Sequence, residues 1–346
     1  MSVIIPARDE AQTIETAVRS ILSTRYQRME LLVVDDRSTD ATRQLVEQLA
    51  RRDVRLRLIH GEELPSGWFG KQWACAQGYR MARGDVLLFT DADTRHEPEL
   101  LGRAIAALDT TGADLLTVAP RQACITLWER LVMPQIWVLL GYRYHPARVN
   151  RARHRRDVIA NGQFIMMPRA SYEAIGTHAV VRGEVAEDLA LAQRVVGTGK
   201  KLHFAFADQF METRMYRDLP HLIEGWSKNV YLGGRRSYPD EPLLRALVPT
   251  LLSSMMLFWL LPPALLALSV TVPWPALIPP AAAATIAAAV FWVVISIGMR
   301  IPPWFGLGYP LGALMTLYII LRSTVRGERR VEWKGRTYDA SEIRQE

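Results

Sequence analysis

The chain has 346 residues, 49% of them hydrophobic, and a formal net charge of +7. This length and apolar content allow one large domain or two ordinary ones with a buried core, and they exclude a chain that is disordered by composition. The two cysteines, Cys75 and Cys124, lie far apart with no CxxC or Cys/His cluster near them, which argues against a zinc site or a disulfide framework.

Strand-like and helix-like segments alternate in the first part of the chain. The β-branched or apolar runs that predict strands are 2–6, 29–36, 55–59 and 85–91, and the segments with helical spacing of apolar residues are 7–23, 38–52 and 71–82. We expect Ser38 or Thr39 to cap the second helix. This alternation predicts an α/β fold with a mainly parallel sheet and helices on both faces. The opening run SVIIP is too short for the apolar part of a signal peptide, so we expect this part to be cytosolic.

Acidic pairs follow three of the predicted strands. Asp9 and Glu10 follow the first, Asp35 and Asp36 close the second, and the run FTDADT after the fourth contains Asp91 and Asp93. Since ligands of such sheets bind at the carboxyl ends of the strands, we expect the three pairs to meet at one edge. Any single pair could instead be turn chemistry, because Asp is common in turns.

The chain has no GxGxxG after the first strand and no GxxxxGK[ST] loop to hold phosphates. A divalent cation held by one or two carboxylates can clamp a diphosphate instead. The Asp91-Ala-Asp93 spacing therefore predicts a Mg²⁺ or Mn²⁺ site.

The middle of the chain combines an apolar run with basic residues. Segment 127–144 reads as an apolar, aromatic-rich helix broken at Pro134. It can be an internal helix, but a membrane-surface helix fits the downstream spans better. The arginines in and after it can lie at lipid head groups or in a solvated loop; they are Arg143, Arg148, Arg151, Arg153, Arg155 and Arg156. No aromatic interleaving or fold signature points to nucleic acid.

Segment 186–195 predicts an amphipathic helix with Glu187 and Asp188 in its first turn. Acids at a helix start can simply complement the helix dipole. A carboxylate there can also take the proton of an acceptor hydroxyl.

The last third of the chain predicts membrane helices. No charged residue or histidine occurs from 246 to 299, and the candidate spans are 250–270, 277–299 and 305–321. The tail after Leu321 is basic and by the positive-inside tendency belongs in the cytosol; its cations are Arg322, Arg326, Arg329, Arg330, Lys334 and Arg336. Three full spans from a cytosolic domain would put that tail outside, so we expect a cytosolic tail with one segment re-entrant or interfacial. The Pro262-Pro263 break makes the first segment the suspect.

The motifs together resemble those of a known family. IPARDE at 5–10, VVDDRSTDAT, FTDADT, GWFGKQWACAQG, NGQFIM, VAEDLALA, MYRD, GWSKN and EWKGRTY at 332–338 are similar to a family 2 glycosyltransferase of the GT-A fold, in the carotenoid and hopanoid associated, diaponeurosporenoate-type branch. Relatives often carry a membrane helix before the first strand, and their Pro-x-x-Asn-Glu has Asn where Asp9 stands here.

The resemblance implies roles for individual residues. Pro6, Asp9 and Glu10 lie in the loop under the nucleoside, Asp36 accepts from the base, Lys71 reaches a phosphate and Asp91 lies near the ribose and the metal. It implies that Asp93 is the direct metal ligand and Asp188 the catalytic base. Contacts to the sugar or acceptor are assigned to Asn161, Gly162, Gln163, His178 and Glu187; the first four can equally be turn or core residues.

The sequence thus predicts a metal-dependent, inverting glycosyltransferase that moves one sugar from a nucleotide-sugar, UDP-linked by resemblance, to a lipid such as a carotenoid or other isoprenoid. No Arg-Trp follows Arg235 and Arg236, unlike in processive relatives, which favours transfer of a single sugar. The alternatives are a polyprenyl-phosphate glycosyltransferase and a non-catalytic membrane scaffold.

We expect a multi-pass protein of the cytoplasmic membrane with its catalytic domain facing the cytosol. The predicted domains are a glycosyltransferase domain at 1–240 (donor half 1–120, acceptor half 121–240), membrane helices at 246–322 and a basic tail at 323–346. Oligomeric state, donor sugar and choice of metal are not encoded in any pattern of the sequence.

Overall fold

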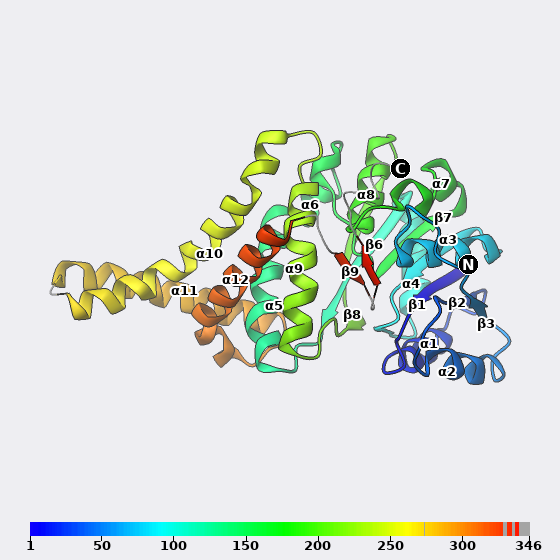
Figure 1. Cartoon of the computed structure of the whole chain (residues 1–346), viewed down its shortest axis with the longest axis horizontal. Helices are drawn as coiled ribbons and strands as arrows, with labels where there is room; N and C mark the ends of the chain where they lie inside the picture. The colour runs from blue at the N-terminus through cyan, green and yellow to red at the C-terminus, as the bar shows by residue number, and fades with distance from the viewer. Residues whose placement is uncertain (273, 328–330, 334–335, 339–346) are drawn as a thin grey trace. The chain divides into compact units, whose positions relative to one another are not determined.

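The computed structural model describes residues 1–272, 274–327, 331–333 and 336–338 (Figure 1). The chain divides into two compact units. The first comprises Met1–Gln122, Tyr144–Arg214 and the C-terminal segment from Glu328, and the second comprises Ala123–Arg143 and Met215–Gly327. Each unit is therefore built from segments that are separate in the sequence.

An eight-stranded sheet forms the first unit, in the order β3-β2-β1-β4-β7-β6-β8-β5. Its strands are β1 Ser2–Ala7, β2 Glu30–Asp35, β3 Leu56–His60, β4 Val86–Thr90, β5 Thr94–His96, β6 Leu115–Gln122, β7 Phe164–Pro168 and β8 Leu202–Thr213. The first four are parallel, as predicted, and β6 is parallel to β8. β7 runs antiparallel to β4 and β6, and β5 antiparallel to β8.

Helices cover both faces of this sheet, which confirms the α/β prediction. Their bounds are α1 Ile14–Leu22, α2 Thr42–Ala50, α3 Gly70–Met81, α4 Leu100–Thr111, α6 Pro146–Val149, α7 Arg169–Ala174 and α8 Glu187–Gly197, with short 3-10 turns η1 Arg155–Asp157 and η2 His178–Val181. Alternate side chains of β1 point to opposite faces of the sheet. Val3 and Ile5 belong to the core with α1, α2 and α4, whereas Ile4 lies close to Gly78 of α3.

The predicted helix starts were too early in two places. Helix α1 begins at Ile14 because the chain from Arg8 forms a loop in which Asp9 has a φ of 52°. The expectation that Ser38 or Thr39 caps the second helix is wrong: α2 begins at Thr42, whose N–H donates to Asp40 Oδ1 (2.9 Å). The hydroxyl of Ser38 instead accepts from the Asp9 N–H (3.0 Å).

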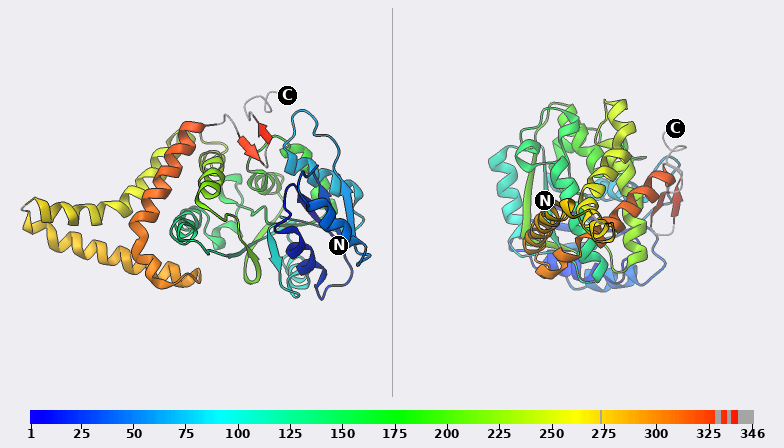
Figure 2. Two further views of the ribbon diagram at one scale, coloured as in Figure 1. Left: turned by 60° about the horizontal axis from the view of Figure 1, so that its bottom comes forward. Right: turned by 90° about the vertical axis from the view of Figure 1, so that its left-hand side faces the viewer.

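Helices make up the second unit. They are α5 Leu127–Arg143, α9 Leu219–Arg236, α10 Pro242–Thr271, α11 Ile278–Gly298 and α12 Tyr309–Arg326, with 3-10 turns η3 Pro275–Leu277 and η4 Pro303–Gly308. Helices α10 and α11 lie side by side in Figure 1 and in the left view of Figure 2, and they are in contact. Helix α12 contacts α5, α9 and α10, and α10 also contacts α9, so these four helices pack together.

Two predicted helix breaks do not occur. Helix α5 continues through Pro134, and α10 continues through Pro249, Pro262 and Pro263. Helix α5 is also not a surface helix: Val132, Met133 and Ile136 are buried in the core that α5 shares with α9 and α12. The prediction of a membrane-surface helix for segment 127–144 is therefore wrong, because packing against α9 and α12 buries this helix.

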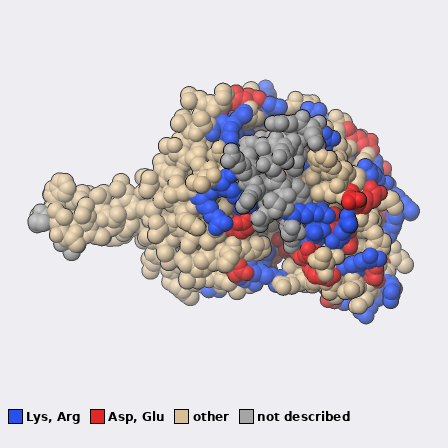
Figure 3. Space-filling model, viewed as in Figure 1, with Lys and Arg blue, Asp and Glu red and all other residues tan. Residues whose placement is uncertain are grey.

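Three helices are long and apolar enough to cross a membrane: Pro242–Ser269, Pro275–Gly298 and Pro303–Arg326. Only 6% of the most apolar window of the first is buried within the protein, against 22% for the second and 39% for the third. The chain has no Lys, Arg, Asp or Glu from 246 to 299, and the far-left part of Figure 3, formed by α10 and α11, shows none of their colours. Helices α10 and α11 therefore present apolar surface outward, as the sequence predicted.

The basic tail is partly neutralised within the second unit. Arg322 pairs with Glu224 of α9 (3.0 Å), and Arg326 pairs with the same carboxylate. Arg329, Arg330 and Lys334 lie outside the described residues.

Candidate active site

The loops after β1, β2 and β4 meet at one edge of the sheet because these strands are parallel neighbours. Asp36 follows the last residue of β2, and Asp91 follows the last residue of β4. Asp9 and Glu10 lie in the loop after β1. Pro6 itself is buried within β1, so that loop begins at Arg8.

A lysine joins two carboxylates from distant parts of the chain. Lys71, in the first turn of α3, places its Nζ 2.8 Å from Asp91 Oδ1 and 2.8 Å from Glu187 Oε1. Its side chain is 22% exposed, and that of Glu187 is 11% exposed. The strand end that carries the Asp-x-Asp and the helix that carries the Glu-Asp are thus held together by one ammonium group.

Asp93 lies next to this cluster, but its carboxylate is not paired in the same way. Its Oδ1 is buried and accepts no hydrogen bond within the described part of the chain. Burial raises the pKa of Asp93 to about 7, and the charges of Asp91 and Glu10 add to the effect. A buried carboxylate oxygen without a partner is costly unless a cation or a proton compensates it.

These residues fit a cation held with the help of substrate. Among the described residues no group of three or more His, Cys, Asp or Glu side chains forms a cage that could hold a metal ion by itself. Mg²⁺-type sites commonly use one or two carboxylates and complete the shell with substrate phosphates and water. The orphan Oδ1 of Asp93 fits that donor set better than Asp91, whose Oδ1 is paired with Lys71.

Asp188 is fixed by two backbone donors. The Gly162 N–H donates to Oδ2 (2.9 Å), and the Leu189 N–H donates to Oδ1 (2.7 Å). Burial and the neighbouring Glu187 raise the pKa of Asp188 to about 6. A carboxylate with a pKa near neutrality can accept a proton in the reaction and remain ionised before it.

Gly162 is required by the space around it. A Cβ at this position would lie 3.0 Å from Lys71 Nζ and 3.3 Å from oxygens of Asp188 and Glu187. The predicted sugar contact is therefore a backbone donor packed among three charged groups. Asn161 and Gln163 bond to each other on either side of it, with Asn161 Nδ2 3.1 Å from Gln163 Oε1.

The structure places His178 in the core rather than at the surface. It is 2% exposed, and its Nδ1 lies 2.6 Å from the Tyr172 hydroxyl. Burial lowers the pKa of His178 to about 4, so the ring is neutral at physiological pH. The core alternative that the sequence left open is favoured.

The two carboxylates paired with Lys71 have pKa values that are shifted in opposite directions. Burial works against charge on Glu187, but Lys71 outweighs it and lowers the pKa of this carboxyl. For Asp91 burial is stronger than the attraction of Lys71, and the pKa is raised. Burial opposes the charge of Lys71 as well, yet its two carboxylates hold its pKa well above the usual value.

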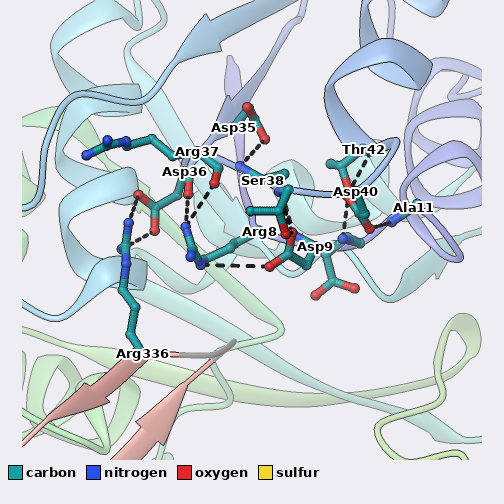
Figure 4. A network of polar contacts seen from close by, with 12 residues as sticks. Arg8, Asp9, Ala11, Asp35, Asp36, Arg37, Ser38, Asp40, Thr42 and Arg336 are labelled. Atoms are coloured by element: carbon teal, nitrogen blue, oxygen red, sulfur yellow. Dashed lines mark hydrogen bonds and ion pairs between the residues drawn. The ribbon is translucent and has the colours of Figure 1, made fainter.

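A second network ties the loops after β1 and β2 together (Figure 4). Asp9 accepts from the Thr39 N–H (2.7 Å), and Arg8 Nη1 donates to the carbonyl of Asp36 (2.6 Å). The Asp36 carboxylate, 0% exposed, is paired with Arg336 of the C-terminal strand β10 Arg336–Tyr338, which pairs with β9 Val331–Trp333. Asp9 is thus a loop-stabilising residue, and the Asp36 carboxylate is covered.

Sequence reasoning missed three of these contacts. It did not find the Lys71–Glu187 pair, the donation from Gly162 to Asp188 or the Arg336–Asp36 pair. Arg336 lies within a motif that the sequence singled out, 332–338, and that motif was the one available signal. The other two contacts join residues whose proximity only the folded chain creates.

Comparisons with known proteins agree with this geometry. The family model described as glycosyl transferase family 2 matches residues 2–176. Over 250 residues the chain is 24% identical to 4,4'-diaponeurosporenoate glycosyltransferase of Staphylococcus haemolyticus, which covers 70% of this chain and 64% of the relative. The chain thus matches somewhat less than two thirds of that relative's length.

A shorter match and a solved structure complete the comparison. Glycosyltransferase AglD of Haloferax volcanii is 33% identical over 112 residues, covering 30% of this chain and 17% of AglD. The structure titled mannosyltransferase PcManGT from Pyrobaculum calidifontis in complex with GDP-Man and Mn²⁺ is 18% identical, has a TM-score of 0.59, and covers 94% of this chain and 86% of that chain. This likeness confirms the GT-A α/β fold predicted from the sequence.

Proposed function

The chain belongs to glycosyl transferase family 2, and from that premise we propose that it transfers one sugar, with inversion, from a UDP-sugar to an isoprenoid lipid at a membrane. The observation that carries the proposal is the pair of acidic centres at one sheet edge: Asp93 with its orphan oxygen and Asp188 on two backbone donors. Asp93 suits the diphosphate of the sugar donor, and Asp188 suits the acceptor.

On the donor side, Asp93 would hold a divalent cation together with the diphosphate, with Asp91 next to it. The bound cation would stabilise the negative charge that develops on the leaving diphosphate. Lys71 keeps Asp91 in place and brings a positive charge to the same edge.

On the acceptor side, Asp188 would take the proton of an acceptor hydroxyl. As the bond from the acceptor oxygen to the sugar C1 forms on one face, the bond from C1 to the diphosphate oxygen breaks on the other. The proton passes to Asp188 and the nucleoside diphosphate leaves with the bond's electron pair, so one displacement inverts the anomeric centre. The N–H groups of Gly162 and Leu189 hold the carboxylate oriented throughout.

The lipid acceptor is supported by two findings. The relative from Staphylococcus haemolyticus is named for an isoprenoid carboxylate, diaponeurosporenoate. Helices α10 and α11 present apolar side chains outward, among them Phe258 (65% exposed) and Val294 (59% exposed). A lipid substrate and an enzyme with such helices would meet in the same membrane. A carboxylate acceptor is already ionised at neutral pH, and Asp188 would then orient it rather than deprotonate it.

The proposal is tested with the full chain in bacterial membranes supplied with labelled UDP-sugars and Mg²⁺ or Mn²⁺. Lipids extracted from membranes with the wild-type protein should contain a new labelled glycolipid by mass spectrometry. The matched control is Asp93→Asn, which should give none. A labelled product equal in both membranes, or label only in free sugar, would contradict the assignment.

A second candidate, transfer to a polyprenyl phosphate, is favoured by a basic depression in the first unit. It has a volume of about 530 Å³ and is lined mainly by exposed basic residues, which are His145, Arg148, Arg151, Arg153 and His154. The segment is anchored, because Asn150 Nδ2 donates to the Phe204 carbonyl (2.9 Å) and Val149 is buried. Arginines held in this way suit a phosphate group.

The two candidates differ in what the acceptor must carry. Purified enzyme is given a matched pair of acceptors, a polyprenol and its phosphate. Product from the phosphate alone, lost in Arg151→Gln/Arg153→Gln but retained in Arg51→Gln/Arg52→Gln, would favour the second candidate. Product from acceptors without phosphate favours the first.

A further inference from the structure

The C-terminal motif at 332–338 has no role in the function proposed so far. Its Arg336 lies in β10, which belongs to the same compact unit as the donor edge of the sheet. Asp36, the residue after β2, is its partner although 300 positions separate the two in the sequence. A contact this distant in sequence and this close in space calls for an explanation.

Arg336 and Asp36 form a bidentate ion pair. Arg336 Nη1 donates to Asp36 Oδ2 (2.6 Å), and Nη2 donates to Oδ1 (3.2 Å) (Figure 4). The Asp36 side chain is 0% exposed and that of Arg336 is 19% exposed. A guanidinium matches a carboxylate in this way and a lysine does not, because only the planar fork presents two parallel donors.

The backbone of the same loop is fixed independently of this pair. Arg8 Nη1 donates to the carbonyls of Asp36 (2.6 Å) and Arg37 (3.0 Å), and Asp35 Oδ1 accepts from the Ser38 N–H (3.3 Å). The loop therefore has its own supports. The Arg336 side chain acts on the Asp36 carboxylate, which lies at the strand end where a donor's nucleobase is expected.

We propose that Arg336 is a positioning residue of the nucleotide site, which keeps the Asp36 carboxylate ionised and oriented to accept an N–H of the donor's base. The inference rests on the proposed function and deepens it. The base takes over the longer of the two bonds, at Oδ1, while Arg336 keeps the shorter one at Oδ2. A base with a ring N–H, such as uracil, can donate this hydrogen bond to Oδ1.

The charges around Asp36 make this dependence on Arg336 testable by pH. Burial raises the pKa of Asp36, and Arg336 is the strongest influence that lowers it. Arg8 also lowers it, and Asp35 raises it. Without Arg336 the pKa rises further, so the carboxyl is protonated at a higher pH and loses acceptor capacity. Base binding then weakens as pH falls, and does so at a higher pH than in the wild type.

The experiment is calorimetric titration of UDP with Mn²⁺ into the full chain in detergent at about pH 5.5, 7 and 8.5. Arg336→Gln should bind UDP about tenfold more weakly at neutral pH, as expected for loss of a charged hydrogen bond. The ratio of variant to wild-type Kd should increase toward low pH. Comparing ratios removes the titration of Asp93 and Asp188, which both proteins share.

Three further proteins separate positioning from simple loss of charge or fold. Arg336→Lys keeps the charge but not the fork, and should recover part of the affinity at high pH. Arg37→Gln removes an exposed cation from the same loop and should leave the Kd unchanged. In an Asp36→Asn background the effect of Arg336→Gln should largely disappear, because the two residues act as one unit. Thermal unfolding of each variant checks that it folds.

The outcomes distinguish a failure of the proposed function from a failure of the role assigned to Arg336. If the wild type does not bind UDP, the proposed function fails. If it binds UDP and Arg336→Gln binds with the same affinity and pH profile, this inference fails while the proposed function stands. Tighter binding by Arg336→Gln would make the arginine a competitor of the base, which equally overturns the inference.

Discussion

The donor edge of the first unit and the outer helices of the second depart from ordinary globular structure in opposite ways. At the donor edge, carboxylates such as Asp36 and Asp93 have buried oxygens. On α10 and α11, side chains such as Phe258 and Val290 are mainly exposed, the latter by 58%. Soluble proteins avoid both, since buried charge and large exposed apolar surfaces are costly in water.

The difference teaches which partner each region lacks. A buried carboxylate is stable with a cation next to it, and Asp91, Glu187 and Asp36 each have one within the chain. Asp93 Oδ1 has none within the described residues, and under the proposed function a divalent cation would be its partner. The apolar helices likewise expose side chains that lipid would cover under the proposed function. The predictions below test each half of this comparison.

The largest effect is expected for Asp93→Asn. The amide keeps the shape but cannot neutralise a divalent cation, so sugar transfer should fall by about a thousandfold or more. Activity over a Mn²⁺ titration measures it, with Asp109→Asn, an exposed acid of α4, as the control. Equal rates for wild type and Asp93→Asn would remove the proposed metal role.

Next in size is Asp188→Asn, which should lower kcat by about 10² to 10⁴ on a hydroxyl acceptor. The wild-type rate should rise with pH through about 6, because Asp188 must be ionised to accept the proton and its pKa lies at about 6. A kcat–pH profile in both proteins provides the measurement. A variant that keeps both the rate and the profile would show that Asp188 is not the base.

Val290→Lys tests the apolar half. A lysine near the middle of a membrane span costs about 2.5 to 3.5 kcal/mol, so the share of protein recovered in membranes should fall clearly. Val54→Lys is the matched control, since Val54 is 97% exposed but lies in the first unit. Equal membrane recovery of the two variants would argue that α11 faces water.

The smallest effect is expected for Gly162→Ala. The new methyl would lie 3.0 Å from Lys71 Nζ, and its accommodation should cost about 1 to 2 kcal/mol with a loss of about tenfold in kcat. Denaturant unfolding and turnover measure the two effects. Gly102→Ala on α4 has no atom within 4 Å of its Cβ and should be neutral or slightly stabilising. Similar behaviour of both variants would mean that the space around Gly162 is not tight.

The sequence predicted the sheet and the acidic edge well because both depend on local periodicity. Alternating runs such as 29–36 and 85–91 define strands without knowledge of their neighbours. Parallel order then brings Asp9, Asp36 and Asp91 to one edge. The reversal of β7 was not predicted, since no residue of Phe164–Pro168 encodes the direction of its partner strands.

The details of the site could be predicted less well. Spacing cannot reveal that Lys71 pairs with Glu187, because 116 positions separate them. Proline rules wrongly predicted breaks at Pro134 and Pro262, where the surrounding helix is retained despite the missing N–H donors. The predicted helix cap at Ser38 was also wrong. Its hydroxyl accepts a hydrogen bond from the Asp9 N–H in the loop after β1 instead of capping α2.

The intact course of α10 through Pro262 and Pro263 has a mechanical consequence. Two adjacent residues cannot donate to the carbonyls one turn earlier, those of Phe258 and Trp259, so this turn is held by two fewer backbone bonds than its neighbours. In hydrocarbon those carbonyls need water or another donor. Helix α10 is therefore easiest to bend at this one turn. If α10 and α11 had to adjust to the thickness of a bilayer, α10 would bend there.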